Sequence, residues 1–545
     1  MRRTCFALAL VVASPFAILI GTPVAFAQLP QAYQACGGRD VNPSEKIAAC
    51  TAIIQSGGAN PHNRAVCYVN RGLAHGRQGN HDKAVIDFRE ALRLDSTLTT
   101  ANKNLTVALT QRGVSYGKQE DHERAIQDLR EALRLDPDHS PARKNLAVAL
   151  HNRGVVFAKA AENDRAFADF DEALRLNPDY ARAYASRSSL LSSKGELDRA
   201  ISDANRAIAI DPTLASGYSA RGVAYGKKGE HGRAVADLTE AIRLQPTSAT
   251  AYANRANAYR AKGDFDRAIA DASEAIRLDG NAALPYSTRA AAYTRKCELD
   301  RAAVDADQAI RLNPNLASAH NNRGIILMLK RDADSAIQSF ERAYSIDSRD
   351  PAPLVNLGSA LRKKGNLALA KAKLDQAIQM DPARALAYLN RGTVLSKQSE
   401  FEKAMSDFDR SIQLEPKAES YHARGYTRLL KGEIKGAIED EDRAISLDPT
   451  FASAFTGRGL IKERRGEIEA AIDDFRSALA IPKKCTSDGW AQDTARKEIT
   501  SLSSSKTVEP RNNSSVPSSE PKVESSKPAS RPLPAIENLI IDDYG

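Results

Sequence analysis

The sequence of 545 residues contains few aromatic residues and few cysteines. Phe, Trp and Tyr together account for 6% of it, with a single Trp, and there are six cysteines. Six cysteines are too few for a scaffold that is held together by disulfides. A net charge of +9 is small for this length, so charge alone does not indicate nucleic-acid binding. With 42% hydrophobic and 27% charged residues, the composition excludes collagen, wholesale disorder and a polytopic membrane protein.

A targeting signal is predicted at residues 1–27. A short basic segment at 2–3 and an apolar run at 5–20 precede a small-x-small cleavage motif at 25–27. This order predicts a signal peptide, a mature chain that begins at Gln28, and an exported protein that is either periplasmic or secreted. The alternative is that the segment is kept as a membrane anchor.

Alanine recurs through most of the chain at a nearly constant spacing. Twelve alanines from Ala84 to Ala471 are separated by 33, 34 or 41 residues, and a column of small residues lies twelve positions before them. In each period apolar residues follow a helical repeat on two successive segments, and in most periods a proline closes the unit. The pattern predicts twelve units of helix, tight turn and helix between 61 and 482. Because one helix pair cannot bury its own apolar face, the units must stack.

The unit length, the small-residue columns and the terminal prolines resemble the tetratricopeptide repeat over residues 61–482. This resemblance implies an all-α fold, an α-solenoid in the form of a right-handed superhelix of about twelve helix-turn-helix repeats. It also implies that the first helices line a concave groove. Outside the repeats we expect an N-terminal cap helix region at 28–60 and a C-terminal cap helix at 483–502. A disordered Ser/Pro-rich tail with a short apolar and acidic end is expected at 503–545.

Two of the cysteines lie beside the predicted N-terminal cap helix. Cys36 precedes this helix and Cys50 lies within it, so in an oxidising compartment a disulfide between them would hold the cap in place. Cys67 is a competing partner for either of them. Cys297 and Cys485 are expected to be unpaired.

The second and third units are longer than the others. Each carries seven extra residues, which lie before Gly113 and Gly154. Seven residues are close to two helical turns, so they extend the first helix by about 10 Å without rotating its apolar face. We expect a paired ridge at these two units, with neutral drift in length as the alternative.

Opposite charges recur in fixed columns of the repeats. An Arg precedes the small-residue column in eleven units, and an Asp follows the alanine column by three residues in ten. The ninth unit has Leu357 and Lys373 at these positions and so loses both charges together. This predicts an Arg–Asp ion-pair ladder, within units or between neighbours, in which the guanidinium meets the carboxylate through two bonds. The alternative is that the Arg column binds a ligand. Representative pairs are Arg221 with Asp237, Arg255 with Asp271, and Arg289 with Asp305.

Two charges replace apolar residues in the eleventh unit. Arg428 and Glu441 occupy columns that hold aromatic residues in other units. Because an unpaired charge in the core is costly, we expect these two side chains to pair with one another. The alternative is a solvated acidic helix face at 439–442.

Lys or Arg recurs near the end of the first helix in eight units. The family resemblance places this column at the rim of the groove, where it would favour an acidic peptide or polymer. The simpler explanation, which we favour, is that a cation at a helix C-terminus satisfies the last carbonyl groups. The candidate rim residues are Arg77, Lys118, Lys159, Lys227, Arg295, Lys363, Lys397 and Arg464.

No catalytic motif was identified. The sequence contains neither the zinc-protease helix motif nor a phosphate-binding loop, and the repeats leave too little chain for an ordinary catalytic domain. We therefore expect a non-enzymatic scaffold that binds proteins or peptides in its groove. It should need no cofactor or metal, bind no nucleic acid, and have no membrane span after signal cleavage. The alternatives are a component of an envelope assembly or polysaccharide-export machine that recognises an acidic polymer, and an enzyme with an unrecognised surface site. The partner and the oligomeric state are left open.

Overall fold

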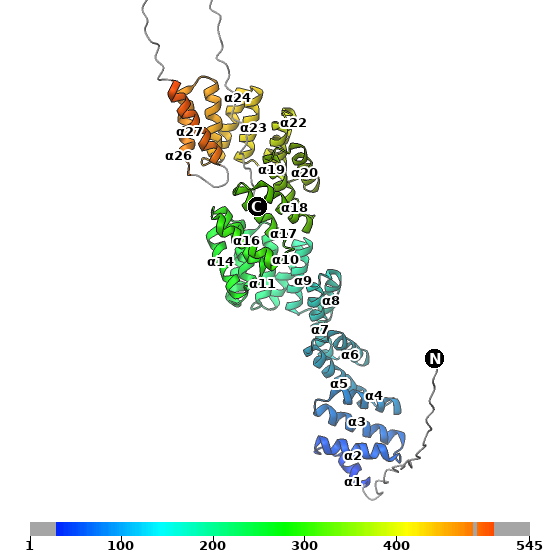
Figure 1. The fold of residues 1–545 in the computed structure, drawn as a ribbon. Helices are drawn as coiled ribbons and strands as arrows, with labels where there is room; N and C mark the ends of the chain where they lie inside the picture. The colour runs from blue at the N-terminus through cyan, green and yellow to red at the C-terminus, as the bar shows by residue number, and fades with distance from the viewer. Residues whose placement is uncertain (1–28, 483–487, 506–545) are drawn as a thin grey trace, which may run out of the picture. The chain divides into compact units, whose positions relative to one another are not determined.

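The computed structural model describes residues 29–482 and 488–505 (Figure 1). All regular secondary structure in these two ranges is α-helical, in 27 helices. This confirms the predicted all-α solenoid of helix pairs. The helices belong to two compact units, one that ends at Ala224 and one that starts at Tyr225. The predicted signal peptide and nearly all of the predicted tail lie outside the described residues.

The first unit contains a two-helix cap and the first four repeats. The cap consists of α1 (Leu29–Gly37) and α2 (Pro43–Ser56). The repeats are α3 (Pro61–Arg77) with α4 (His81–Leu94), α5 (Thr99–Lys118) with α6 (His122–Leu135), α7 (Ser140–Lys159) with α8 (Asn163–Leu176), and α9 (Ala181–Lys194) with α10 (Leu197–Ile210). The boundary between the units falls inside the next helix, α11 (Ala215–Lys227).

The second unit continues the same alternation of first and second helices. It begins with α12 (His231–Leu244), α13 (Ala249–Ala261), α14 (Phe265–Leu278), α15 (Ala283–Arg295), α16 (Leu299–Leu312), α17 (Ala317–Leu329) and α18 (Ala333–Ile346). It continues with α19 (Ala352–Lys363), α20 (Leu367–Met380), α21 (Ala385–Lys397), α22 (Phe401–Leu414), α23 (Ala418–Lys431) and α24 (Ile434–Leu447). Its last helices are α25 (Ala452–Arg464), α26 (Ile468–Ala480) and α27 (Asp488–Ser505), and α27 packs on α25 and α26.

The small-residue column lets the two helices of a repeat approach closely. A Cβ atom on Gly154 would lie 2.7 Å from Cε1 of Phe170, and one on Gly392 would lie 2.7 Å from Cε1 of Phe408. A Cβ atom at either position would force the facing Phe side chain to shift, so the close approach of the two helices favours glycine there. The alanine column fills the same interface and is fully buried, as Ala268 illustrates.

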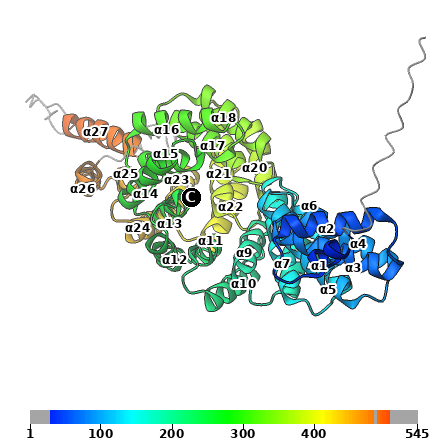
Figure 2. The ribbon, with the colours of Figure 1, turned by 90° about the horizontal axis from the view of Figure 1, so that it is seen from below.

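The first helices form the inner layer of each unit. In the first unit α3, α5, α7 and α9 contact one another in order, and in the second unit α13 to α25 do the same. No second helix contacts the next second helix within either described unit. A stack of helix pairs curves toward the layer that is in closer contact, so the first helices line the concave face. Figure 2 shows α15, α17 and α21 inside α16, α18 and α20.

The first helices of the second and third repeats are longer than the others. α5 and α7 contain 20 residues each, whereas α13 contains 13. The added turns of α5 bury Ala101 and Leu105, in one hydrophobic core with Ala142 and Leu146 of α7. The two extensions therefore pack as part of the solenoid.

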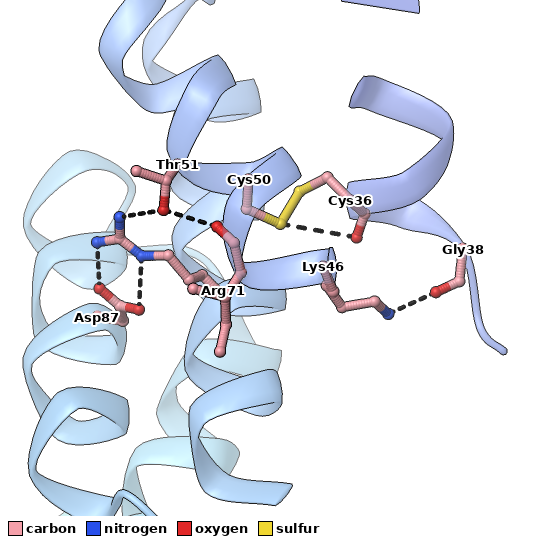
Figure 3. Close-up of a disulfide and its surroundings, with 8 residues drawn as sticks. Cys36, Gly38, Lys46, Cys50, Thr51, Arg71 and Asp87 are labelled. Atoms are coloured by element: carbon pink, nitrogen blue, oxygen red, sulfur yellow. Dashed lines mark hydrogen bonds and ion pairs between the residues drawn. A yellow bond between two sulfur atoms is a disulfide. The ribbon is translucent and has the colours of Figure 1, made fainter. Parts of the chain in front are cut away.

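A disulfide joins the two helices of the cap. Cys36 of α1 is bonded to Cys50 of α2, while Lys46 donates a hydrogen bond to the carbonyl oxygen of Gly38 (Figure 3). Cys67 is a free, buried thiol whose pKa is raised by burial.

Cys297, in the turn that follows α15, is disulfide-bonded, so the expectation that it is unpaired is wrong. Cys485 lies outside the described residues. The cysteines show no spacing that points to a partner for Cys297, so the sequence did not indicate this bond.

Candidate interaction surfaces

A bidentate Arg–Asp pair joins the two helices in nine of the repeats that lie wholly within one unit. In each of them Nε and Nη2 of the Arg donate to both carboxylate oxygens of an Asp sixteen residues later. For Arg289 and Asp305 the two distances are 2.7 and 2.8 Å, and the side chains are only 19% and 6% exposed. The pairs are Arg71–Asp87, Arg112–Asp128, Arg153–Asp169, Arg187–Asp203, Arg255–Asp271, Arg289–Asp305, Arg391–Asp407, Arg424–Asp440 and Arg458–Asp474.

The same arginines also bond to the preceding repeat or to the cap. Nη1 of Arg391 donates to Asp375 Oδ1 at 2.7 Å, and Nη1 of Arg289 donates to Ser273 Oγ at 2.9 Å. Nη1 of Arg71 donates to Thr51 Oγ1 of the cap at 3.1 Å (Figure 3). The ladder therefore runs both within and between units, and its guanidinium groups are committed to structure.

Two further positions of the ladder are described separately, because one falls on the boundary between the two units and the other lacks the aspartate. Arg221 donates to Asn205 Oδ1 at 2.8 Å in the first unit, and Asp237 is buried in α12 of the second unit. Arg323 has no aspartate partner sixteen residues later, because Ser339 occupies that position, and it pairs with Asp307 at 3.0 Å.

The eight candidate rim cations are the last residues of their helices. They end α3, α5, α7, α11, α15, α19, α21 and α25 in turn. A cation at this position faces the negative end of the helix dipole. The position therefore agrees with the explanation that these cations satisfy the last carbonyl groups of their helices. Arg295 also lies over the ring of Phe265, 5.6 Å from its centroid.

Carboxylates are segregated between the two layers of helices. The first helices from α3 to α21, ten in all, contain no Asp or Glu, whereas every second helix from α4 to α22 contains at least one. Since the first helices line the inner layer, that layer presents basic, amide and apolar side chains without a carboxylate of its own. The cations were predicted from the sequence but this segregation was not, although a count of acidic residues in each predicted helix reveals it.

A polar cavity of about 900 Å³ lies on the inner face of the second unit. It is lined by α13, α15, α17 and α19 and by the loops that precede α17, α19 and α21. None of the candidate rim cations lines it, although Arg295 and Lys363 end two of the helices that do. The polar lining includes Asn257, Arg260, Asn321, Asn322, Asn356 and Arg384, with Asp347 and Asp350 at one loop.

Amide side chains connect the helices around this cavity. Asn356 donates to Asn321 Oδ1 at 3.0 Å, and Asn322 donates to the carbonyl oxygen of Ser287 at 3.0 Å. Each amide has both donors and acceptors, the combination that matches a peptide backbone. None of these residues belonged to the sequence-predicted site, because only the stacking of the repeats brings them together.

Arg260 supplies positive charge to the cavity. Its guanidinium donates to Asn257 Oδ1 at 3.2 Å through both Nε and Nη2. Burial lowers the pKa of this guanidinium, and the positive charge of Arg295 adds to the effect. An anionic group bound beside Arg260 would offset both the burial of its charge and the repulsion by Arg295.

The expectation that Arg428 and Glu441 of the eleventh repeat pair with one another is wrong. Arg428 pairs with Asp440 at 2.8 Å, whereas Glu441 accepts from Nδ1 of His422 at 2.9 and 3.0 Å. Adjacent residues on a helix point about 100° apart, so Asp440 and Glu441 cannot face the same partner. His422 and Glu441 are fully buried, and burial raises the pKa of Glu441 to about 7 although His422 opposes the shift.

In residues 29–482 and 488–505, no three His, Cys, Asp or Glu side chains are grouped so that they could hold a metal ion. Over the same ranges, no helix is both long enough and apolar enough to cross a membrane.

Within each unit, a stack of helix pairs whose first helices form an inner layer defines a helical-repeat protein. Models described as tetratricopeptide repeat or TPR repeat match residues 65–98, 106–139, 189–229, 215–248, 249–281, 289–351 and 355–419, together more than half of the chain. The chain belongs to the tetratricopeptide repeat family, whose repeats mark it as a scaffold for protein–protein interaction.

Three solved structures illustrate the similarity. The crystal structure of the APC/C hetero-tetramer Cut9–Hcn1 is 15% identical with a TM-score of 0.47, over 87% of this chain and 95% of that one. Yeast Tom70 is 16% identical with a TM-score of 0.38, over 74% of this chain and 97% of the Tom70 chain. YrrB, described as a TPR protein with an unusual peptide-binding site, is 26% identical with a TM-score of 0.27, over 34% of this chain and 95% of the YrrB chain. No curated protein matches the chain.

Proposed function

We propose that this protein is an exported, non-enzymatic scaffold that binds acidic segments of partner proteins along its first helices. The observation that carries the proposal is the absence of Asp and Glu from ten successive first helices. A face without carboxylates attracts an acidic segment and repels a basic one, so it selects partners by charge. The polar cavity of the second unit offers amides for the backbone of such a segment and Arg260 for its carboxylates.

Export is supported by two independent features. The first 27 residues have the order of a secretory signal, and the cap carries the Cys36–Cys50 disulfide, a bond typical of oxidising compartments. Fractionation followed by N-terminal sequencing tests this part. We expect the mature chain outside the cytoplasm with Gln28 as its first residue; a cytoplasmic chain that still begins with Met1 would contradict it.

Binding can be measured with the full mature chain and a fluorescent decaglutamate peptide. The double variant Arg260→Gln/Arg384→Gln removes two cavity cations, and we expect affinity to fall about tenfold, which corresponds to about 1.4 kcal/mol. The matched control is Arg267→Gln/Arg277→Gln on α14, where both side chains are exposed on a second helix. An equal loss in both variants would show non-specific attraction and contradict a site at the cavity.

The acidic-polymer alternative is tested in the same assay. An alginate oligomer of matched charge has carboxylates but no peptide amides, so it cannot use Asn321, Asn322 and Asn356 as a backbone would. We expect the peptide to bind more tightly than the oligomer. The reverse order would favour a component of an envelope polymer-export machine.

A further inference from the structure

A second surface, in the first unit, is built from three helices that expose the same kinds of residue. Val66 on α3, Val107 on α5 and Val148 on α7 are 37%, 47% and 40% exposed, although valine is usually buried. They are spaced by 41 residues and so occupy the same column of successive repeats. Because α3 contacts α5 and α5 contacts α7, the three valines form one row across the stack (Figure 1).

Four further rows run beside the valines. One helical turn separates each row from the next, and every side chain in them is exposed or half-buried. A row of His and Lys precedes the valines, and an amide row, a second aliphatic row and a basic row follow them. In that order the rows are His62, Lys103 and Lys144; Asn70, Gln111 and Asn152; Leu73, Val114 and Val155; and Arg77, Lys118 and Lys159. We call the valines and these four rows the α3–α5–α7 surface.

The α3–α5–α7 surface carries positive charge that no neighbouring acid neutralises. The helices α3, α5 and α7 contain no Asp or Glu. Within the described residues, none of the five Lys and Arg side chains of the surface forms an ion pair, whereas His62 is bonded to Asp95. Cations on both sides of an apolar patch attract a partner that has acids on both sides of its own apolar face. A basic partner, or the same surface of a second copy, would be repelled.

The spacing of the rows matches an α-helix that lies across the three helices. The two aliphatic rows are seven residues apart, or about 10 Å, and the two outer rows are fifteen residues apart, or about 22 Å. An α-helix with its side chains is about 10–12 Å wide, so its apolar face covers both aliphatic rows while its flanks face the outer rows. Packed helices lie about 10 Å apart, and seven residues of a helix rise about 10.5 Å. Apolar residues that recur every seven positions therefore meet α3, α5 and α7 in turn.

We propose that the α3–α5–α7 surface binds an amphipathic α-helix of a partner protein whose apolar stripe has acidic residues on both sides. The stripe covers the two aliphatic rows, and the acids on its two sides face Lys103 and Lys144, and Lys118 and Lys159. This inference rests on the proposed function, since its ligand is an acidic segment of a partner protein, and it adds the conformation and the apolar stripe of that ligand. It does not depend on the cavity in the second unit.

A synthetic peptide tests the proposed ligand against the full mature chain. The probe is a fluorescent peptide of three heptads, with leucine at the first and fourth positions, glutamate at the fifth and seventh, and alanine elsewhere. The control peptide has the same composition in an order that gives no apolar stripe. Fluorescence anisotropy should show that the probe binds at least tenfold more tightly than the control peptide. Equal affinities would overturn the proposal.

A proline in the probe tests the helical conformation. Proline in place of the central alanine of the middle heptad breaks the helix but leaves the leucines and glutamates in place. We expect this peptide to bind at least tenfold more weakly than the probe. An unchanged affinity would mean that the ligand is extended, and the proposal of a bound helix would be wrong.

Matched variants of the protein locate the bound peptide. Val107→Ser/Val148→Ser should weaken binding of the probe about tenfold, because two apolar contacts are lost. Ile86→Ser/Val304→Ser is the control, since both residues are exposed and lie on second helices. A loss of the same size in both variants would place the peptide elsewhere and contradict the assignment to the α3–α5–α7 surface.

A charge reversal separates recognition from damage to the fold. The variant Lys103→Glu/Lys118→Glu/Lys144→Glu/Lys159→Glu should bind the probe more weakly than the wild type does. It should bind a lysine version of the probe, with every glutamate replaced, more tightly. A structural defect cannot produce this gain, so its absence would overturn the assigned charges.

The two proposals can fail separately. Decaglutamate has no leucine, and the assay with it reports on Arg260 and Arg384 at the cavity. A probe that binds the α3–α5–α7 surface while decaglutamate shows no site would contradict only the cavity. If decaglutamate binds as expected and the valine variant leaves the probe unaffected, only the present inference is wrong.

Discussion

The guanidinium of Arg289 connects three helices through one planar group. It bonds Asp305 on α16 through Nε and Nη2 and Ser273 on α14 through Nη1. Its carbon also lies 5.7 Å from the ring centroid of Tyr286 on its own helix. A lysine could make one of these contacts but not the set, because its ammonium is a point charge without a planar fork. Residues of this kind fix the register of the repeats and leave recognition to their neighbours.

The His422–Glu441 pair places two ionisable side chains in the core of the eleventh repeat. The His422 ring lies 5.5 Å from the ring of Phe451 and 6.5 Å from the ring of Trp490, so the pair is enclosed by aromatic residues. Asp440 raises the pKa of Glu441 slightly, whereas Arg458 lowers it, and desolvation is the largest cause. The single Trp of the chain reports on this site by fluorescence.

Glu441 predicts a pH-dependent stability of the C-terminal repeats. Its pKa is about 7 in the fold against 4.5 ordinarily, so it stabilises the fold below pH 4.5, and this contribution is lost as the pH rises toward 7. Glu441→Gln cannot ionise, so we expect it to be more stable than the wild type at pH 8, by on the order of 3 kcal/mol, and similar at pH 5. Urea unfolding followed by Trp490 fluorescence measures the free energy of unfolding of the variant and the wild type at both pH values. A difference that is the same at both pH values would contradict the assignment.

The tight turn inside each repeat is the element in which local conformation is most demanding. In several repeats glycine occupies the left-handed position, as Gly263 does with φ of 79°. Ala161 holds the equivalent position between α7 and α8 with φ of 61°, a conformation that a Cβ atom disfavours.

Replacing this alanine should stabilise the first unit. We expect Ala161→Gly to raise the free energy of unfolding by about 1 kcal/mol, because relief of the left-handed strain exceeds the entropy cost of glycine. The matched control is Ala160→Gly, one residue earlier, where φ is −81° and glycine should destabilise by up to about 1 kcal/mol. Urea unfolding followed by circular dichroism distinguishes the two. Equal effects of the same sign would be inconsistent with strain at Ala161.

The elements could be predicted from the sequence because each repeat is determined locally. The small-residue and alanine columns fix which faces of two successive helices meet, and the recurrence of Arg255 and Asp271 indicates which side chains pair. Placement around a helix and across the stack was harder to predict. The partners of Arg428 and Glu441 depend on helix rotation, and Asn321 and Asn356 meet only because successive first helices are neighbours.

Within each of the two units, the helix pairs are stacked so that each repeat packs on its neighbours in the sequence. No single hydrophobic core grows with chain length, so a local change should alter stability locally. The length of the chain therefore provides surface, and that surface differs along it: exposed valines between cations on α3, α5 and α7, and an amide-lined cavity from α13 to α19.

The cap disulfide tests this locality. Cys36→Ala/Cys50→Ala opens a loop with a sequence separation of 14, and we expect about 3 kcal/mol of stability to be lost from the cap. Hydrogen exchange should quicken in α1 and α2, and less in α3, while α15 to α18 keep the wild-type rates. Cys67→Ala is the control, because it removes a buried thiol from the same cluster without opening a loop. Faster exchange throughout the second unit would mean that the chain unfolds as one cooperative body, and the nearest-neighbour description of the stack would have to be abandoned.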